Sequence, residues 1–298
     1  MSETIQYGGQ AVMEGVMMRG PRKVAVAVRN PRGEIVVEEK TLQPWWEKFP
    51  IFKRPILRGF LALIEAMVLG IKMLTFSANI SMDEDEEELS IFELIITIGA
   101  AVGLAVLLFI VLPTVIVHYS GKYLTPFWQN LLEGIIRIVV FLGYVLAISF
   151  LKDIRRVFEY HGAEHKVIHA FEAGEDISRV ENIQKYSTLH PRCGTAFLLI
   201  VMVLTIFFFS FLGSPGLFYR ILSRILLLPL IAGAAYEIIK ISAKYTDKAF
   251  IHLLILPGLW LQKLTTREPD ASQLEVAMRA LAAVLPPEEK IEIPSPQG

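Results

Sequence analysis

The sequence predicts an all-α integral membrane protein with about four transmembrane helices, flanking amphipathic or interfacial helices and a small N-terminal β-hairpin. Of its 298 residues, 53% are hydrophobic and 20% are charged, whereas soluble domains average about 45–50% apolar and about 25% charged residues. The mean hydropathy is +0.49, and several apolar runs approach the roughly 20 residues that a transmembrane helix needs. The net charge of −1 lacks the basic excess of nucleic-acid-binding proteins, so no nucleic-acid partner is expected.

Residues 1–55 are polar enough to lie outside the bilayer as an N-terminal segment. Two runs rich in β-branched residues, 23–29 and 33–39, flank Asn30-Pro31-Arg32-Gly33, whose proline and glycine suit a β-turn. The pattern predicts a β-hairpin, and because two strands alone are marginally stable, the hairpin must pack on other elements. We interpret the preceding glycine-rich segment, Tyr7 to Pro21, as irregular structure packed against protein.

Apolar stretches after residue 55 define a membrane domain over residues 56–264. The first, Ile56 to Thr75, carries charges at amphipathic spacing and is expected to lie in the headgroup region. The expected transmembrane helices are Ile91 to Val117, Leu131 to Leu151, Thr195 to Leu212 and Ile221 to Ile241. Phe250 to Leu261 is too short to cross and contains Pro257-Gly258, which favours a re-entrant or interfacial segment. The polar C-terminal tail, 265–298, is predicted to contain one short helix from Ser272 to Val284.

Lysine and arginine are distributed unevenly among the connections between these spans. The connection 152–195 holds seven of them, whereas the connection between the first two spans holds only Lys122. Because cytoplasmic connections carry an excess of Lys and Arg, the distribution places both termini and residues 152–195 on the cytoplasmic side.

The residues with the clearest chemical pattern lie in this cytoplasmic connection. His161, Glu164 and His165 form an H-x-x-E-H motif on a predicted helix that continues the second span and ends near Gly174. Two histidines four residues apart can bind one metal ion from adjacent helical turns. In such inverted zincin motifs the glutamate serves as general base, so Glu164 is the candidate catalytic residue.

A catalytic metal site needs a third protein ligand and one open position. His190 and Cys193, the only cysteine in the chain, are the candidates, and the expected ion is a divalent metal, with zinc as the first choice. If both bind, four ligands close the site and a structural metal is favoured over a catalytic one. The alternative without metal is a juxtamembrane helix whose histidines form local hydrogen bonds or face water.

Three further residues are candidates for binding the substrate: Arg192, Arg19 and Glu14. Either arginine could meet an anionic group, although a headgroup-facing arginine is an alternative for Arg192. For Glu14 and Arg19, a local ion pair is the simpler interpretation.

The string Gly8 to Pro21, together with Tyr160 to Lys166 and His190 to Thr195, resembles the YqhQ family of bacterial membrane proteins over almost the whole chain. The resemblance implies a multi-pass protein of the bacterial cell (inner or plasma) membrane. The family is a domain of unknown function that is commonly labelled a metal-dependent enzyme. That label can rest on the same histidines and therefore adds no independent support for a metal site.

The function hypothesis is a metal-dependent hydrolase at the cytoplasmic membrane face, acting on a lipid-borne or membrane-proximal substrate. Its expected partners are membrane lipids. The first alternative is a non-catalytic scaffold or adaptor in which a metal ion joins the cytoplasmic segments. The second is a transporter, suggested by the i, i+4 pair Glu133 and Arg137; four spans are few for a solute path, so a transporter would require a homo-oligomer.

Overall fold

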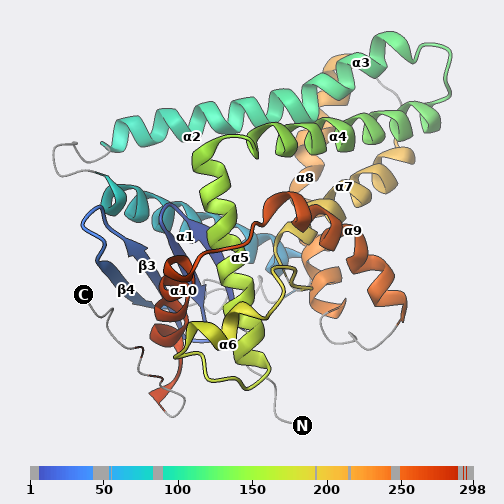
Figure 1. Ribbon diagram of the computed structural model, residues 1–298. Helices are drawn as coiled ribbons and strands as arrows, with labels where there is room; N and C mark the ends of the chain where they lie inside the picture. The colour runs from blue at the N-terminus through green and yellow to red at the C-terminus, as the bar shows by residue number, and fades with distance from the viewer. Residues whose placement is uncertain are drawn as a thin grey trace.

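The computed structural model describes residues 7–42, 54, 56–82, 90–191, 193–213, 216–242, 249–287, 291 and 293. The elements in chain order are β1 (Gly8–Val12), β2 (Gly15–Arg19), β3 (Lys23–Arg29), β4 (Ile35–Thr41), α1 (Leu57–Ser81), α2 (Ile91–Val106), η3 (Leu107–Val111), α3 (Leu112–Ser120), α4 (Pro126–Ile148), α5 (Lys152–Glu172), α6 (Val180–Gln184), α7 (Thr195–Ser210), α8 (Leu217–Ser242), α9 (Ala249–Thr265) and α10 (Ala271–Val284). The fold is mostly helical, with long apolar helices and a small N-terminal antiparallel sheet, as the sequence predicts (Figure 1).

The predicted hairpin is confirmed as β3 and β4, which pair from Arg29 and Ile35 outward. Its turn is stabilised by the Asn30 side chain, which accepts a hydrogen bond from the Glu34 amide. Gly33 has a φ of +86°, a left-handed conformation that glycine adopts without steric cost.

The prediction of irregular structure for the glycine-rich segment is wrong. Residues 8–19 form a second hairpin, β1 with β2, and the sheet order is β1-β2-β3-β4. All residues of β2 from Gly15 to Met18 are buried, because helices cover both faces of the sheet. A strand buried on both faces has no polar–apolar alternation, so the usual sequence signal for a strand was missing.

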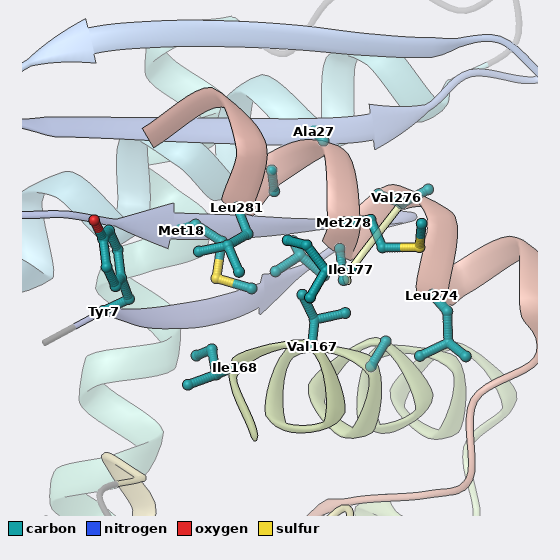
Figure 2. Packing of buried hydrophobic residues seen from close by; sticks show 14 of the residues in the cluster. Tyr7, Met18, Ala27, Val167, Ile168, Ile177, Leu274, Val276, Met278 and Leu281 are labelled. Carbon is teal, nitrogen blue, oxygen red and sulfur yellow. The ribbon is translucent and has the colours of Figure 1, made fainter. Parts of the chain in front are cut away.

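One face of the sheet packs against α5 and α10 to form the largest hydrophobic core. Val16, Met18 and Ala27 of the sheet are buried together with Val167 of α5 and Leu281 of α10. Figure 2 shows the side chains of Met18, Val167 and Leu281 between these elements. The predicted C-terminal helix is therefore part of this core, and it begins with a capping box between Asp270 and Gln273.

The opposite face of the sheet packs against α1. Met73 of α1 is buried with Val24, Val26 and Val28 of β3, so α1 uses its C-terminal half to cover the sheet. Its N-terminal half packs against α8, where Arg58 forms an ion pair with Glu237. The helix predicted to lie in the headgroup region thus joins the sheet to the membrane helices.

Among the described residues, four helical segments are long and apolar enough to cross a membrane: Leu57–Ser81, Ile91–Ser120, Pro126–Ile148 and Leu217–Lys240. Three of them correspond to predicted spans. The predicted span after residue 195 is α7, which has 16 residues and a length of about 24 Å. The length criterion therefore includes α1 and leaves out α7.

The shared core bears on whether α1 or α7 crosses the membrane. The sheet, α5 and α10 are packed together, so they must lie on the same side of a bilayer, and an even number of crossings must separate each pair. If α1 crossed in addition to α2–α3 and α4, the sheet and α5 would be on opposite sides. This parity favours crossings by α2–α3, α4, α7 and α8, with α1 along the membrane surface.

The expectation that α5 continues the second span as one helix is wrong. The chain leaves helical geometry at Ser149–Leu151, and Leu151 is extended with φ −72° and ψ 133°. Figure 1 shows α5 turning away from the end of α4 toward the sheet. The break directs α5 away from the membrane helices and into the core beneath them. Its C-terminal end is as predicted, since Gly174 has a φ of +75° and closes a Schellman motif.

A buried charged cluster joins the membrane helices. The predicted pair of Glu133 and Arg137 is confirmed, and Glu133 also accepts hydrogen bonds from Arg220 and Arg224 of α8. Each of these four residues is at most 7% exposed. One carboxylate and three guanidinium groups therefore connect α4 to α8 inside the membrane domain.

The helix before α4 is adapted to this cluster. The π-helical turn Leu107–Val111 interrupts the α2–α3 helix, and the carbonyl of Phe109 accepts a hydrogen bond from Arg137 Nε. A π-turn displaces backbone carbonyls from their α-helical partners, which makes this carbonyl available to the arginine.

Candidate metal centre

Three of the four predicted metal ligands lie together. His161, His165 and Cys193 each offer one ligand atom, and these atoms are all within 4.8 Å of one another. The two histidines project from adjacent turns of α5, whereas Cys193 comes from the short connection that precedes α7. The H-x-x-E-H motif is thus completed by a residue 28 positions beyond His165.

Both histidines are oriented by backbone carbonyls. His161 Nδ1 donates to the Thr265 carbonyl at 2.8 Å, and His165 Nδ1 donates to the Thr188 carbonyl at 2.5 Å. With Nδ1 protonated, each neutral ring carries its lone pair on Nε2. Such carbonyl partners hold metal-binding histidines in the required tautomer.

The Nε2 atoms face the site. His161 Nε2 lies 3.2 Å from Cys193 Sγ, close to the roughly 3.5 Å between nitrogen and sulfur ligands of a tetrahedral zinc ion. His165 Nε2 is buried and has no hydrogen-bond partner among the described residues. Burial lowers the pKa of His165 to about 2, so the ring is neutral and able to bind a cation. Burial also raises the pKa of the Cys193 thiol, an effect that a bound cation would oppose.

The position of α5 beside α9 depends on one glycine. A Cβ atom at Gly162 would lie 2.0 Å from the carbonyl oxygen of Arg267, so only glycine permits this approach. The Arg267 amide in turn donates to the carbonyl of Phe158 on α5. This contact holds the end of α9 against α5 and thereby places the Thr265 carbonyl at His161.

Glu164 is buried beside the three ligands. Burial raises its pKa to about 7, with a further increase from Cys193 and opposing effects from His161 and the Gly9 amide. Its Oε2 atom has no hydrogen-bond partner among the described residues. A Cβ atom at Gly9 would lie 2.9 Å from the Glu164 carboxyl carbon. The glycine of β1 therefore lets the sheet approach this carboxylate and supply a hydrogen bond to it.

His190 is outside the group of three. Its backbone amide and carbonyl are both hydrogen-bonded to the Gln262 side chain, and its ring contacts His169 at a centroid distance of 4.5 Å. Its Nε2 lies 3.6 Å from Glu172, and its ring centroid is 5.6 Å from that of His165. Burial lowers its pKa to about 4. His190 thus forms a second layer next to the three ligands.

The proposed substrate-binding residues lie at different places. Glu14 forms an ion pair with Arg156 and accepts a hydrogen bond from the Tyr160 hydroxyl. Both partners belong to α5, so this is a long-range contact and not the local ion pair with Arg19 that the sequence suggested as the simpler interpretation. Arg19 lines a cleft between the sheet and α1. Arg192 lies outside the described residues.

Two contributors to the site were not predicted from the sequence. Gly9 contacts Glu164, and Gln262 fixes the backbone at His190. The glycine-rich composition of residues 8–20 was a signal for close backbone approach, but it did not name the partner. No local pattern marks Gln262, because its role depends on the packing of α9 beside the connection before α7.

Comparison with known proteins identifies the family. Residues 54–287 match the family described as "Protein of unknown function (DUF1385)". The chain belongs to this family. It is 34% identical over 294 residues to "Uncharacterized protein YqhQ" of Bacillus subtilis (strain 168), covering 94% of this chain and 92% of that protein. No solved structure matches the chain. Membership in DUF1385 therefore confirms the resemblance but assigns no activity.

The arrangement meets the requirements of a divalent metal site. Two imidazoles and one thiolate are a donor set that suits zinc, with Cys₂His and His₂Glu as related three-ligand catalytic sets. The buried Nε2 of His165 has no hydrogen-bond partner among the described residues, and the Nδ1 atoms of both histidines are held by backbone carbonyls. Both features are expected of histidines that bind a metal ion through Nε2. A DUF1385 protein with this geometry could hold one ion and leave a fourth position open.

Proposed function

We propose that this protein is a metal-dependent hydrolase at the cytoplasmic face of the bacterial cell membrane, with zinc as the expected ion. The observation that carries the proposal is the group of His161, His165 and Cys193, whose ligand atoms lie within 4.8 Å of one another beside the buried Glu164. Three ligands leave an open position, as catalytic zinc sites require, whereas structural sites are closed by four.

The residues have separate roles in the proposed reaction. His161, His165 and Cys193 hold the ion, which when bound would polarise the scissile bond and make water more acidic. Glu164 accepts the proton of the attacking water and passes it to the leaving group. Oε2 of the Glu164 carboxylate has no hydrogen-bond partner among the described residues, so this oxygen is available for the proton.

Replacement of Glu164 by Gln is expected to abolish turnover while metal remains bound, because glutamine keeps the shape but cannot accept a proton. Loss of a general base typically costs about 10²–10⁴-fold in rate. The assay would incubate zinc-loaded protein with vesicles of bacterial lipid extract and follow new hydrolysis products by mass spectrometry. Asp153→Asn, at an exposed position near the start of the same helix, is the matched control.

A non-catalytic scaffold is the second candidate, and one observation favours it. The three ligands connect α5 to the chain before α7, and His161 is anchored to the end of α9, so a metal ion there would also join these elements. For a scaffold, Glu164→Gln would leave every product level of the vesicle assay unchanged, and removal of metal would only lower thermal stability.

We further propose that both termini and α5 face the cytoplasm. The support is the excess of Lys and Arg in residues 152–195, together with the common core of the sheet, α5 and α10. A protease-cleavable tag at either terminus is expected to be resistant in intact spheroplasts and cleaved after lysis. A tag inserted after Lys122 should be cleaved in both cases, and the opposite pattern would contradict the assignment.

A further inference from the structure

A cleft of about 410 Å³ lies between the sheet and α1. The residues that line it are Tyr7, Gly8, Gly9, Gln10, Met17, Arg19, Gly20, Ala66 and Leu69. The strands β1 and β2 form one wall, where Gly8 pairs with Arg19 across the two strands. The helix α1 forms the other wall through Ala66 and Leu69. The cleft is therefore bounded by a glycine-rich backbone on one side and by the apolar helix α1 on the other.

Of the described residues that line the cleft, Arg19 alone is charged. Among the described residues it forms no hydrogen bond or ion pair, although it lies within electrostatic range of Tyr236. An arginine offers five N–H donors in a planar arrangement that matches carboxylate and phosphate groups. Within the part of the chain that the structure describes, the guanidinium of Arg19 therefore has no acceptor for its N–H groups.

The surroundings of Arg19 favour an anion that carries an apolar part. Leu69 and Ala66 come from a helix whose packing favours a position along the membrane surface, and Met17 is the apolar residue on the sheet side. A Cβ atom at Gly8 would have no neighbour within 4 Å, so the backbone of β1 is open to a ligand at this point. A small soluble anion could pair with Arg19 but would make no apolar contacts with Ala66 and Leu69.

Gly9 connects the cleft to the candidate metal centre. This residue lines the cleft, and its amide is hydrogen-bonded to Glu164. The cleft and the proposed general base are therefore in contact with the same glycine. A ligand with its charged group at Arg19 would lie next to the strand that positions Glu164.

We infer that this cleft binds the anionic phosphate headgroup of a membrane lipid, with Arg19 as its counter-ion and the acyl chains directed along α1 toward the bilayer. The inference names the substrate class for the proposed hydrolase and in that respect rests on the proposed function. The binding itself needs only the cleft and Arg19, so it can be measured without any metal ion.

The test uses the full-length protein in an uncharged detergent, titrated by calorimetry with three probes: dihexanoyl phosphatidate, dihexanoyl phosphatidylcholine and inorganic phosphate. Saturable binding of the phosphatidate is expected, with at least about tenfold weaker binding in Arg19→Gln, since charge-assisted hydrogen bonds are lost. Arg22→Gln, an exposed arginine outside the cleft, is the matched control and should bind as wild type.

A second variant tests whether the ligand needs the volume of the cleft, with Arg19 left in place. Ala66 is exposed, so Ala66→Phe should fold normally, narrow the cleft and weaken phosphatidate binding. Its control is Met67→Phe, at an exposed neighbouring position that does not line the cleft. Equal binding by wild type and both cleft variants would overturn the inference, and so would equal affinity for phosphatidylcholine or inorganic phosphate.

The same titrations after treatment with a chelator separate this inference from the proposed function. Binding that still depends on Arg19 supports the cleft even if the chain proves to hold no metal. Binding that is indifferent to Arg19→Gln overturns the cleft even if zinc is bound at the histidines.

Discussion

Purified protein carrying His161→Ala and His165→Ala is expected to contain no bound zinc, compared with about one ion per chain in the wild type. Two of three ligands are removed, and the affinity should fall by far more than the roughly 10- to 100-fold that loss of a second-layer partner costs. The measurement is mass-spectrometric metal analysis after dialysis against zinc-containing buffer. An unchanged zinc content in the double variant would contradict the metal site.

The geometry also distinguishes between Cys193 and His190, the two candidates for the third metal ligand. Cys193→Ser should lose zinc, because Cys193 Sγ lies 3.2 Å from His161 Nε2 and an alcohol is a poor substitute for a thiolate. His190→Ala should retain the ion, because His190 lies in the adjacent layer with His169 and Glu172. Zinc loss in His190→Ala with folding preserved would indicate a closed four-ligand site and favour the scaffold.

Replacement of Glu133 by Gln is expected to lower the stability of the membrane domain more than any exposed charge substitution. It leaves Arg137, Arg220 and Arg224 buried without the one carboxylate that they share. Removal of one partner from a buried ionic group costs about 3–5 kcal/mol, because the remaining charges stay desolvated. The measurement is the thermal unfolding midpoint of the detergent-solubilised protein.

Two comparisons check the cause of that loss. Glu39→Gln breaks an ion pair with Lys23 in which both side chains are nearly half exposed, and such pairs contribute at most about 1 kcal/mol. Addition of Arg224→Met to Glu133→Gln should recover part of the lost stability, because one uncompensated charge is then removed. A midpoint for Glu133→Gln equal to that of Glu39→Gln would show that the cluster is not a stabilising unit.

Several features could be predicted because their signals are local. The apolar runs define the membrane helices, the Asn30–Gly33 turn defines the β3–β4 hairpin, and Gly174 ends α5 as expected. The i, i+4 spacing of His161 and His165 places both rings on one helix face regardless of the rest of the fold. These patterns act over one turn or one run of the chain, so no distant contact can change them greatly.

The wrong predictions concern features that depend on contacts between distant parts of the chain. Residues 8–19 form a hairpin because α1, α5 and α10 cover both faces of the sheet, and burial on both sides removed the alternation that marks a strand. The break at Ser149–Leu151 contains neither glycine nor proline; it is explained by the packing of α5 against the sheet and α10. In each case, tertiary contacts overruled a local pattern.

The sequence by itself determined the membrane class of this protein and the residues capable of binding a metal ion, since hydropathy and the H-x-x-E-H spacing are properties of the chain alone. Only the tertiary structure decided which of them meet. Cys193 joins the two histidines while His190 lies beside them, and Gly9 reaches Glu164 from a strand 155 residues earlier. The physical reason is that a ligand set is closed by side chains from separate elements, and their distances are fixed only when those elements pack.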